Sequence, residues 1–214
     1  MFGSRLEVKR FESSIQKYES VPVQTGKILF YGHSLFTRCS WIYKTGNNPN
    51  PLLEESVRMK DGSQAIINHG FGTSSADDLL YYYDRLVRPY APRALVLATG
   101  SNDIGFGYSP AEVMQILATL IDWFQAEFPD APIYCIKRPP AIKHKGTENH
   151  AVLHRREFNR LLEEYTAEKD GVSLLEIPAY EEALHDKDGV HLNDKGYPLF
   201  IEHLRAFFES EKLI

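Results

Sequence analysis

The chain has 214 residues, the length of one domain, and its 43% hydrophobic content supports a sizeable core. A net charge of −5, spread without long runs, gives no electrostatic reason to expect nucleic acid as a partner. The longest apolar runs, such as residues 94–98, have the length of a strand and are too short for an integral membrane segment. We therefore expect a single domain over residues 1–214.

Cysteine content and the first residues bear on location. The N-terminal residues contain no apolar stretch typical of a secretion signal. Cys39 and Cys135 are too few for a disulfide scaffold, and Cys135 lies in an apolar strand pattern that favours a buried, reduced thiol. These features favour a cytoplasmic protein. The sequence carries no signal for an oligomeric state.

Short apolar strands alternate with longer helical patterns along the chain. Leu6, Phe11, Ile15 and Tyr18 recur at helical spacing and predict a helix over about residues 5–18. Strands are predicted over 27–31, 65–68, 94–99, 133–137 and 172–175, and further helices over 74–86, 110–128, 148–169 and 194–209. This alternation predicts an α/β fold, a three-layer α/β/α sandwich with a central, mostly parallel sheet of about five strands.

Two of the predicted helices have start signals. Ser109 precedes Pro110, and Glu112 stands at the spacing of a capping box. Asn193 or Asp194 can cap the last helix. These signals support the predicted starts of both helices.

A serine directly follows the first predicted strand, in the segment Gly32-His33-Ser34-Leu35. A hydroxyl placed there can face a pocket, while its backbone N–H opens toward a ligand, as a nucleophile requires. The alternative is a serine that only caps the next helix. The Gly-X-Ser-X-Gly pattern of ordinary α/β-hydrolases is missing.

Asp188 and His191 stand three residues apart before the last predicted helix. On a turn, such a carboxylate can hold the proton of one imidazole nitrogen while the other nitrogen accepts the proton of a serine. A serine hydroxyl needs such a base because it is a poor nucleophile alone. A simple turn with an exposed histidine is the alternative.

Two further segments carry candidate donors for an oxyanion. Asn102, after the third strand, has an amide N–H suited to a developing negative charge, although it could equally brace its loop. Ser101 is a weaker candidate nucleophile than Ser34. After the second strand, Gly70 and Gly72 allow backbone N–H groups to approach a ligand closely. Because parallel strands end at one edge, we expect all four segments to converge there.

These four segments, in this order, resemble the sequence blocks of the SGNH, or GDSL-type, hydrolases. Ser34 matches the family's Gly-Asp-Ser-Leu block, Asn102 its Gly-X-Asn-Asp block, and Asp188 with His191 its Asp-X-X-His block. The resemblance runs from about residue 27 to the C-terminus. It implies a flavodoxin-like fold of the SGNH type, with Ser34, Asp188 and His191 as the catalytic triad.

Two positions depart from the family pattern. His33 replaces the usual acidic residue beside the nucleophile, and an alternating strand end can point it away from Ser34, so we do not assign it as the base. The family's oxyanion glycine falls on Thr73, with Gly72 just before it. Gly72 and Thr73 are therefore alternatives for one backbone donor, beside the N–H of Ser34 and the side chain of Asn102.

The resemblance implies serine-dependent hydrolysis of a small-molecule carboxylic ester through an acyl-enzyme, without a metal or organic cofactor. No broad apolar lid is visible, which favours a short-chain acyl or acetyl ester. Two alternatives stay open: a non-catalytic ligand-binding protein on an SGNH-like fold, and a metal-dependent hydrolase. The second could use His144, His150 and His154, but a His-Glu-X-X-His pattern is missing.

Overall fold

The computed structural model describes residues 9–43, 50–139, 141–144 and 146–214. The helices and strands within these ranges are α1 (Glu12–Glu19), β1 (Ile28–Gly32), α2 (Ser34–Thr37), α3 (Leu53–Ser56), β2 (Ile66–Gly70), α4 (Ala76–Leu86), β3 (Ala94–Ala98), α5 (Ser101–Gly105), α6 (Pro110–Glu127), β4 (Ile133–Lys137), α7 (His150–Glu168), β5 (Val172–Glu176) and α8 (Gly196–Ser210). Short 3-10 turns occupy η1 (Trp41–Tyr43), η2 (Arg88–Tyr90), η3 (Ile142–His144) and η4 (Glu182–Leu184).

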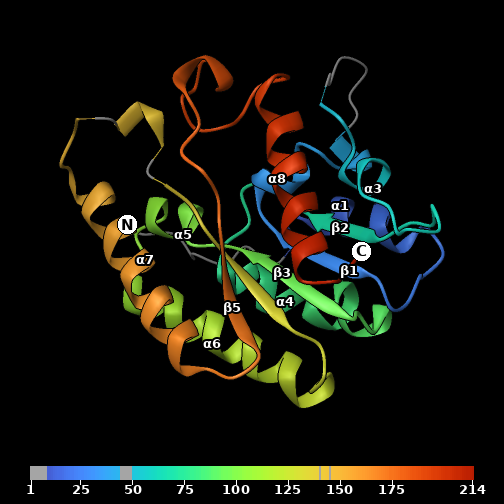
Figure 1. Cartoon of the computed structure of the whole chain (residues 1–214). Coiled ribbons are helices and arrows are strands. Elements are labelled where there is room, and N and C mark those ends of the chain that lie inside the picture. The colour runs from blue at the N-terminus through green and yellow to red at the C-terminus, as the bar shows by residue number, and fades with distance from the viewer. Residues whose placement is uncertain (1–8, 44–49, 140, 145) are drawn as a thin grey trace.

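The strands form one five-stranded sheet in the order β2-β1-β3-β4-β5, and every neighbouring pair is parallel. Helices α1, α4, α6 and α7 pack on one face, and α2, α3 and α8 pack on the other (Figure 1). The predicted α/β/α sandwich with a parallel sheet of about five strands is confirmed. The strand order is that of flavodoxin-like folds.

Successive residues of each strand enter opposite cores. In β1, Leu29 and Tyr31 pack against α4 and α6, whereas Ile28 and Phe30 pack against α3 and α8. All five residues of β1 are buried. A strand buried on both faces must be apolar throughout, which is why these segments read as continuous apolar runs rather than as alternating ones.

The predicted boundaries differ from the observed ones by at most two residues, except at the first helix. That helix begins at Glu12 rather than near residue 5: residues 9–11 form a turn, and residues 5–8 lie outside the described ranges. The sequence analysis missed α3 and α5, because four or five residues are too few to show a helical period.

The start signal of α6 is confirmed, whereas the N-cap of α8 is Lys195, without a side-chain cap bond, rather than Asn193 or Asp194. Ser109 Oγ accepts the Glu112 N–H, and the Glu112 carboxylate accepts the Ser109 N–H, which completes the capping box of α6. Before α8, Asn193 Oδ1 accepts the N–H groups of Lys195 and Gly196.

The end of β2 lies directly against α2, the helix that begins at Ser34. The Asn68 side chain donates to the Phe36 carbonyl at 2.9 Å and accepts the Gly70 N–H at 3.0 Å. A Cβ added at Gly70 would lie 2.5 Å from Phe36 Cβ and 2.6 Å from the Thr37 nitrogen. The missing side chain at Gly70 therefore permits the close approach that seats α2.

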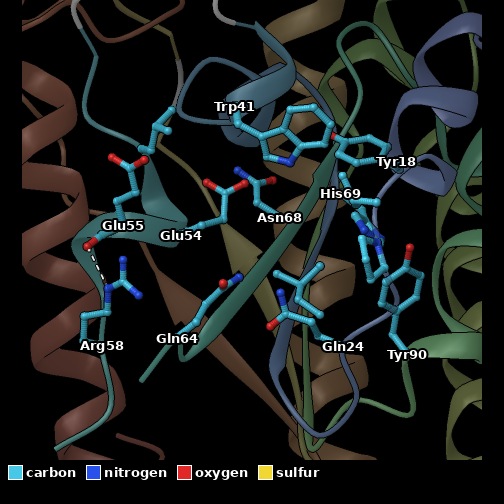
Figure 2. Close-up of a pocket in the computed structure, with 14 residues that line it drawn as sticks. Tyr18, Gln24, Trp41, Glu54, Glu55, Arg58, Gln64, Asn68, His69 and Tyr90 are labelled. Carbon is cyan, nitrogen blue, oxygen red and sulfur yellow. Dashed lines mark hydrogen bonds between the residues drawn. The ribbon is translucent and has the colours of Figure 1, made fainter. Parts of the chain in front are cut away.

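A cavity of about 420 Å³ lies beside the edge strand β2 (Figure 2). Its wall includes Tyr18, Trp41, Asn68 and Tyr90, and the Glu54 side chain points among them. Both carboxylate oxygens of Glu54 are buried and have no hydrogen-bond partner among the described residues. Burial raises the pKa of Glu54 to about 7.

We expect Gly70→Ala to lower the free energy of unfolding by about 1–3 kcal/mol, because the added methyl group collides with backbone that cannot rotate away. Urea denaturation measures the change. Gly105→Ala is the matched control, since a Cβ there meets nothing within 4 Å. Equal stability of the two variants would contradict the close approach.

Glu54 makes stability depend on pH. Because the folded state holds this proton more tightly than the unfolded chain does, the free energy of unfolding falls as pH rises from about 4.5 to about 7. We expect Glu54→Gln to raise it by up to about 3 kcal/mol near pH 8 and by little near pH 4. Denaturation at both pH values checks this. The control is Glu55→Gln at the exposed neighbouring carboxylate, and a pH-independent effect of Glu54→Gln would refute the expectation.

Candidate active site

Three of the candidate residues lie in one hydrogen-bonded chain. His191 Nε2 is 2.8 Å from Ser34 Oγ, and His191 Nδ1 is 2.7 Å from Asp188 Oδ2. Ser34 and His191 are 157 positions apart in the chain. The structure thus brings together a hydroxyl, an imidazole and a carboxylate in the order that proton transfer from the serine requires.

The fold places each of the three groups at the carboxyl edge of the sheet. Ser34 is the first residue of α2, two residues past the end of β1. Asp188 and His191 lie in the loop between β5 and α8, where Asp188 Oδ1 accepts the N–H groups of Val190 at 2.9 Å and of His191 at 3.0 Å. These two bonds hold the loop as a tight turn, so the carboxylate and the imidazole face each other.

Asp188 is negatively charged in this arrangement. Its partial burial opposes ionisation, but the hydrogen bonds from the backbone and side chain of His191 and from the Val190 N–H hold the pKa of Asp188 well below its usual range. An ionised carboxylate is an acceptor only, so it fixes the proton of His191 on Nδ1. His191 Nε2 is then free to accept the proton of Ser34.

His191 is neutral near pH 7. Burial lowers the pKa of His191, and the nearby cations Arg38 and Arg138 lower it further. The hydrogen bond to Asp188 acts in the opposite direction without cancelling these effects. A neutral imidazole is the form that can act as a base.

Arg38 is a site residue that the sequence analysis missed. It follows α2, forms an ion pair with Asp186, and brings its other guanidinium nitrogen within 3.5 Å of Asp188 Oδ2. Since 148 positions separate Arg38 from Asp186, no local spacing could have indicated this contact. Arg38 joins the helix of Ser34 to the loop of His191.

His33 is not positioned as a base for Ser34. It is 1% exposed, and its Nδ1 accepts the Leu35 N–H at 3.3 Å as a cap of α2. Burial lowers the pKa of His33 to about 3, so the ring is neutral. Its Nε2 is buried without a hydrogen-bond partner. The position that is acidic in the family pattern therefore carries no charge here.

A buried carboxylate connects the two loops that carry the candidate oxyanion donors. Asp103 accepts the Gly100 N–H at 2.9 Å within its own loop and the Ala76 N–H at 2.6 Å from the start of α4. Asn102, in the same loop, donates one amide N–H to the Ser74 carbonyl at 2.9 Å. The loop after β3 is thereby fastened to the loop after β2.

Three backbone N–H groups near these loops have no partner among the residues that the structure describes. The N–H groups of Ser34, Gly72 and Thr73 make no hydrogen bond within the described ranges. Thr73 has φ of 63°, in the left-handed region that favours glycine. This backbone conformation matches a position where the family pattern has glycine.

The cavity of Figure 2 is separate from this site, because none of Ser34, Asn102, Asp188 and His191 lines it. In the described ranges, no group of three or more His, Cys, Asp or Glu side chains is placed to hold a metal ion. The rings of His150 and His154 lie 3.7 Å apart on α7. Within the same ranges, no helix combines the length and apolarity needed to cross a bilayer.

Several solved structures share this fold. The psychrotrophic esterase EstA from Pseudoalteromonas sp. is 18% identical, with a TM-score of 0.69 over 86% of this chain and 97% of that one. A GDSL-like lipase from Bacteroides thetaiotaomicron VPI-5482 is 14% identical, with a TM-score of 0.70 over 97% and 100%. A member of the lipolytic protein G-D-S-L family from Veillonella parvula DSM 2008 is 17% identical, with a TM-score of 0.65 over 86% and 99%. At these identities the likeness concerns the fold.

Sequence comparison supplies the family. No curated protein sequence matches the chain significantly. Residues 30–199 match the model of the GDSL-like lipase/acylhydrolase family, a span that reaches from β1 into α8 and contains every candidate residue of the site. The chain therefore belongs to the GDSL-like lipase/acylhydrolase family and is a hydrolase that acts on esters.

Proposed function

We propose that the protein hydrolyses a short-chain acyl or acetyl ester through an acyl-enzyme formed on Ser34. The observation that carries the proposal is the chain of hydrogen bonds from Ser34 Oγ through the His191 imidazole to the Asp188 carboxylate, at 2.8 Å and 2.7 Å. A serine hydroxyl becomes a nucleophile only when a base takes its proton as it attacks. The neutral state of His191 near pH 7 supports that role.

The reaction proceeds in two steps. In the first, His191 Nε2 removes the proton of Ser34 as Oγ attacks the ester carbonyl carbon, and the same proton then passes to the leaving alcohol. In the second, His191 removes a proton from water, which attacks the acyl-enzyme and releases the acid. Asp188 orients the imidazole and stabilises its charged form in both steps, and the Arg38 guanidinium lies 3.5 Å from the same carboxylate oxygen, Oδ2.

The oxyanion is stabilised by the N–H of Ser34, one N–H from Gly72 or Thr73, and the second amide N–H of Asn102. The bond from Asn102 to the Ser74 carbonyl supports this assignment, because it fixes the amide while leaving one N–H unused. The left-handed backbone of Thr73 supports Thr73 as the position of the family's glycine. Each such donor contributes about 2.7–4 kcal/mol to lowering the barrier.

A cytoplasmic location is part of the proposal. Cys39 and Cys135 are both buried and unpaired, which suits a compartment where thiols stay reduced. Burial also raises the pKa of both thiols, so neither is poised to react as a thiolate.

We expect Ser34→Ala to reduce hydrolysis of 4-nitrophenyl acetate by a factor of about 10³ or more, because the acyl-enzyme cannot form. The control is Ser101→Ala, which removes the other candidate hydroxyl and keeps activity of the same order. The release of 4-nitrophenolate measures both. A monoethylphosphonate-type reagent, which inhibits EstA, should add one phosphonyl group to the wild-type protein and none to Ser34→Ala, as read by mass spectrometry.

The same experiment separates the alternatives. Activity that survives Ser34→Ala but is abolished by a chelator would favour a metal-dependent hydrolase. A folded wild-type protein that neither cleaves short esters nor reacts with the phosphonate would favour a non-catalytic binding protein. Either result would refute the mechanism above.

The dependence of kcat/KM on pH reports the titration of His191. Because burial lowers the pKa of His191 below its usual 6.5, we expect kcat/KM to rise with one inflection below pH 6.5 and to be constant near neutral pH. Rates measured with a neutral ester over the acid range give the curve. His185→Gln removes a histidine of the same loop and should leave the inflection unchanged. An inflection above pH 7 would show that His191 is protonated at pH 7 in the free enzyme, which would contradict the lowered pKa.

A further inference from the structure

Two arginines beside the site have no counter-ion within the part of the chain that the structure describes. Arg138 follows β4 and donates to the Val190 carbonyl at 3.2 Å, and Arg155 on α7 donates to the Ser101 carbonyl at 3.2 Å. Neither forms an ion pair with any carboxylate of the described residues, and Arg155 Nε is buried without a partner. By contrast, the next residue, Arg156, is paired with Glu148 at 2.8 Å.

The unpaired charges are costly where they lie. Burial lowers the pKa of Arg138 and of Arg155, and the charge of Arg155 lowers that of Arg138 further. Two half-buried cations that each donate to a neutral carbonyl would be stabilised by an anion placed between them.

A small cavity lies where that charge would fit. Its volume is about 30 Å³, room for about two water-sized atoms such as the oxygens of one carboxylate. Its wall includes Arg138, Arg155, the ion-paired Arg156 and the segment 99–101. The planar guanidinium group binds a carboxylate through two parallel hydrogen bonds, so both arginines suit this ligand.

Position 33, which is acidic in the family pattern, does not provide a negative charge for the two arginines. His33 stands where the family pattern has an acidic residue, and both Arg138 and Arg155 act electrostatically on its ring. The ring is neutral, and because its Nδ1 accepts the Leu35 N–H, its unpartnered Nε2 carries the proton. A buried N–H donor is thus added to two cations, and the substitution at position 33 leaves the cluster without a negative group.

The cavity adjoins the catalytic groups. Arg155 contacts Ser101, which precedes the oxyanion donor Asn102, and Arg138 contacts Val190, which precedes His191. The cavity lies over the ends of β3 and β4, whereas Ser34 follows β1, the neighbour of β3. Across the sheet, β3 and β4 lie about one and two strand spacings, of about 4.8 Å each, from β1.

We propose that Arg138 and Arg155 form a carboxylate-binding subsite beside Ser34, so that the preferred ester carries a carboxylate a few bonds from the scissile carbonyl. The assignment rests on the proposed esterase function for its location, but the binding of the anion does not depend on hydrolysis. The carboxylate belongs either to the acyl part or to the alcohol part of the substrate.

Binding is tested first, on Ser34→Ala so that no turnover occurs. We expect glutarate to bind this variant in isothermal titration calorimetry and the affinity to fall at least tenfold when Arg155→Gln is added. Adding Arg160→Gln instead, at an exposed arginine of the same helix that does not line the cavity, should change it less than twofold. Absence of glutarate binding, equal affinity after Arg155→Gln, or tighter binding of inorganic phosphate than of glutarate would overturn the carboxylate subsite.

Specificity is tested on the wild-type protein, which avoids any variant that fails to fold. Monoethyl glutarate is compared with its amide analogue ethyl glutaramate for the acyl side, and 4-acetoxybenzoate with 4-acetoxybenzamide for the alcohol side. We expect kcat/KM for the charged member to exceed that of the neutral one at least tenfold in one pair, which identifies the side. No preference in either pair would overturn the proposal.

The two proposals fail separately. If glutarate binds Ser34→Ala but the wild type cleaves no ester, the esterase function is wrong and the anion site stands. If neutral esters are cleaved and glutarate does not bind, the esterase function stands and the anion site is wrong.

Discussion

The common direction of the five strands is the constraint from which the site follows. Because every strand is parallel to its neighbours, all carboxyl ends open on one edge of the sheet. In the sheet, β1 lies between β2 and β3, so the chain passes from β1 to the neighbour on one side and later to the neighbour on the other. The loops after β2 and β3 therefore lie on opposite sides of the end of β1. Ser34 lies at that point, with Thr73 and Asn102 on its two sides.

Burial determines the charges at this edge. It keeps His191 and His33 neutral, whereas hydrogen bonds keep Asp188 ionised despite its partial burial. The two histidines nevertheless differ in what they can do. His191 Nε2 contacts the Ser34 hydroxyl. In His33 the one acceptor nitrogen, Nδ1, instead accepts the backbone N–H of Leu35. Position, more than residue type, separates the candidate base from a helix cap.

Several energetically unfavourable features lie at the carboxyl edge of the sheet. Thr73 holds a backbone conformation that suits glycine, and Arg138 and Arg155 lack counter-ions among the described residues. Such strained or unpaired groups persist when the surrounding structure compensates for them, and they gather where a ligand binds. The Asp103 carboxylate provides part of that compensation, because it ties the loop after β3 to α4. Glu54 shows a similar cost beside β2, in a different cavity.

The fold and the candidate residues could be predicted from the sequence alone, because local sequence patterns indicate both. Apolar runs of strand length between helical patterns specify a doubly covered parallel sheet, and short blocks around Ser34, Asn102 and His191 carry the family resemblance. Contacts between distant segments were decided by the tertiary structure. No local sequence pattern indicates the ion pair of Arg38 with the loop of Asp188. The same holds for the absence of a counter-ion for Arg138 among the described residues. Spacing reports neighbours along a helix or strand, whereas a charge depends on everything that the fold packs around it.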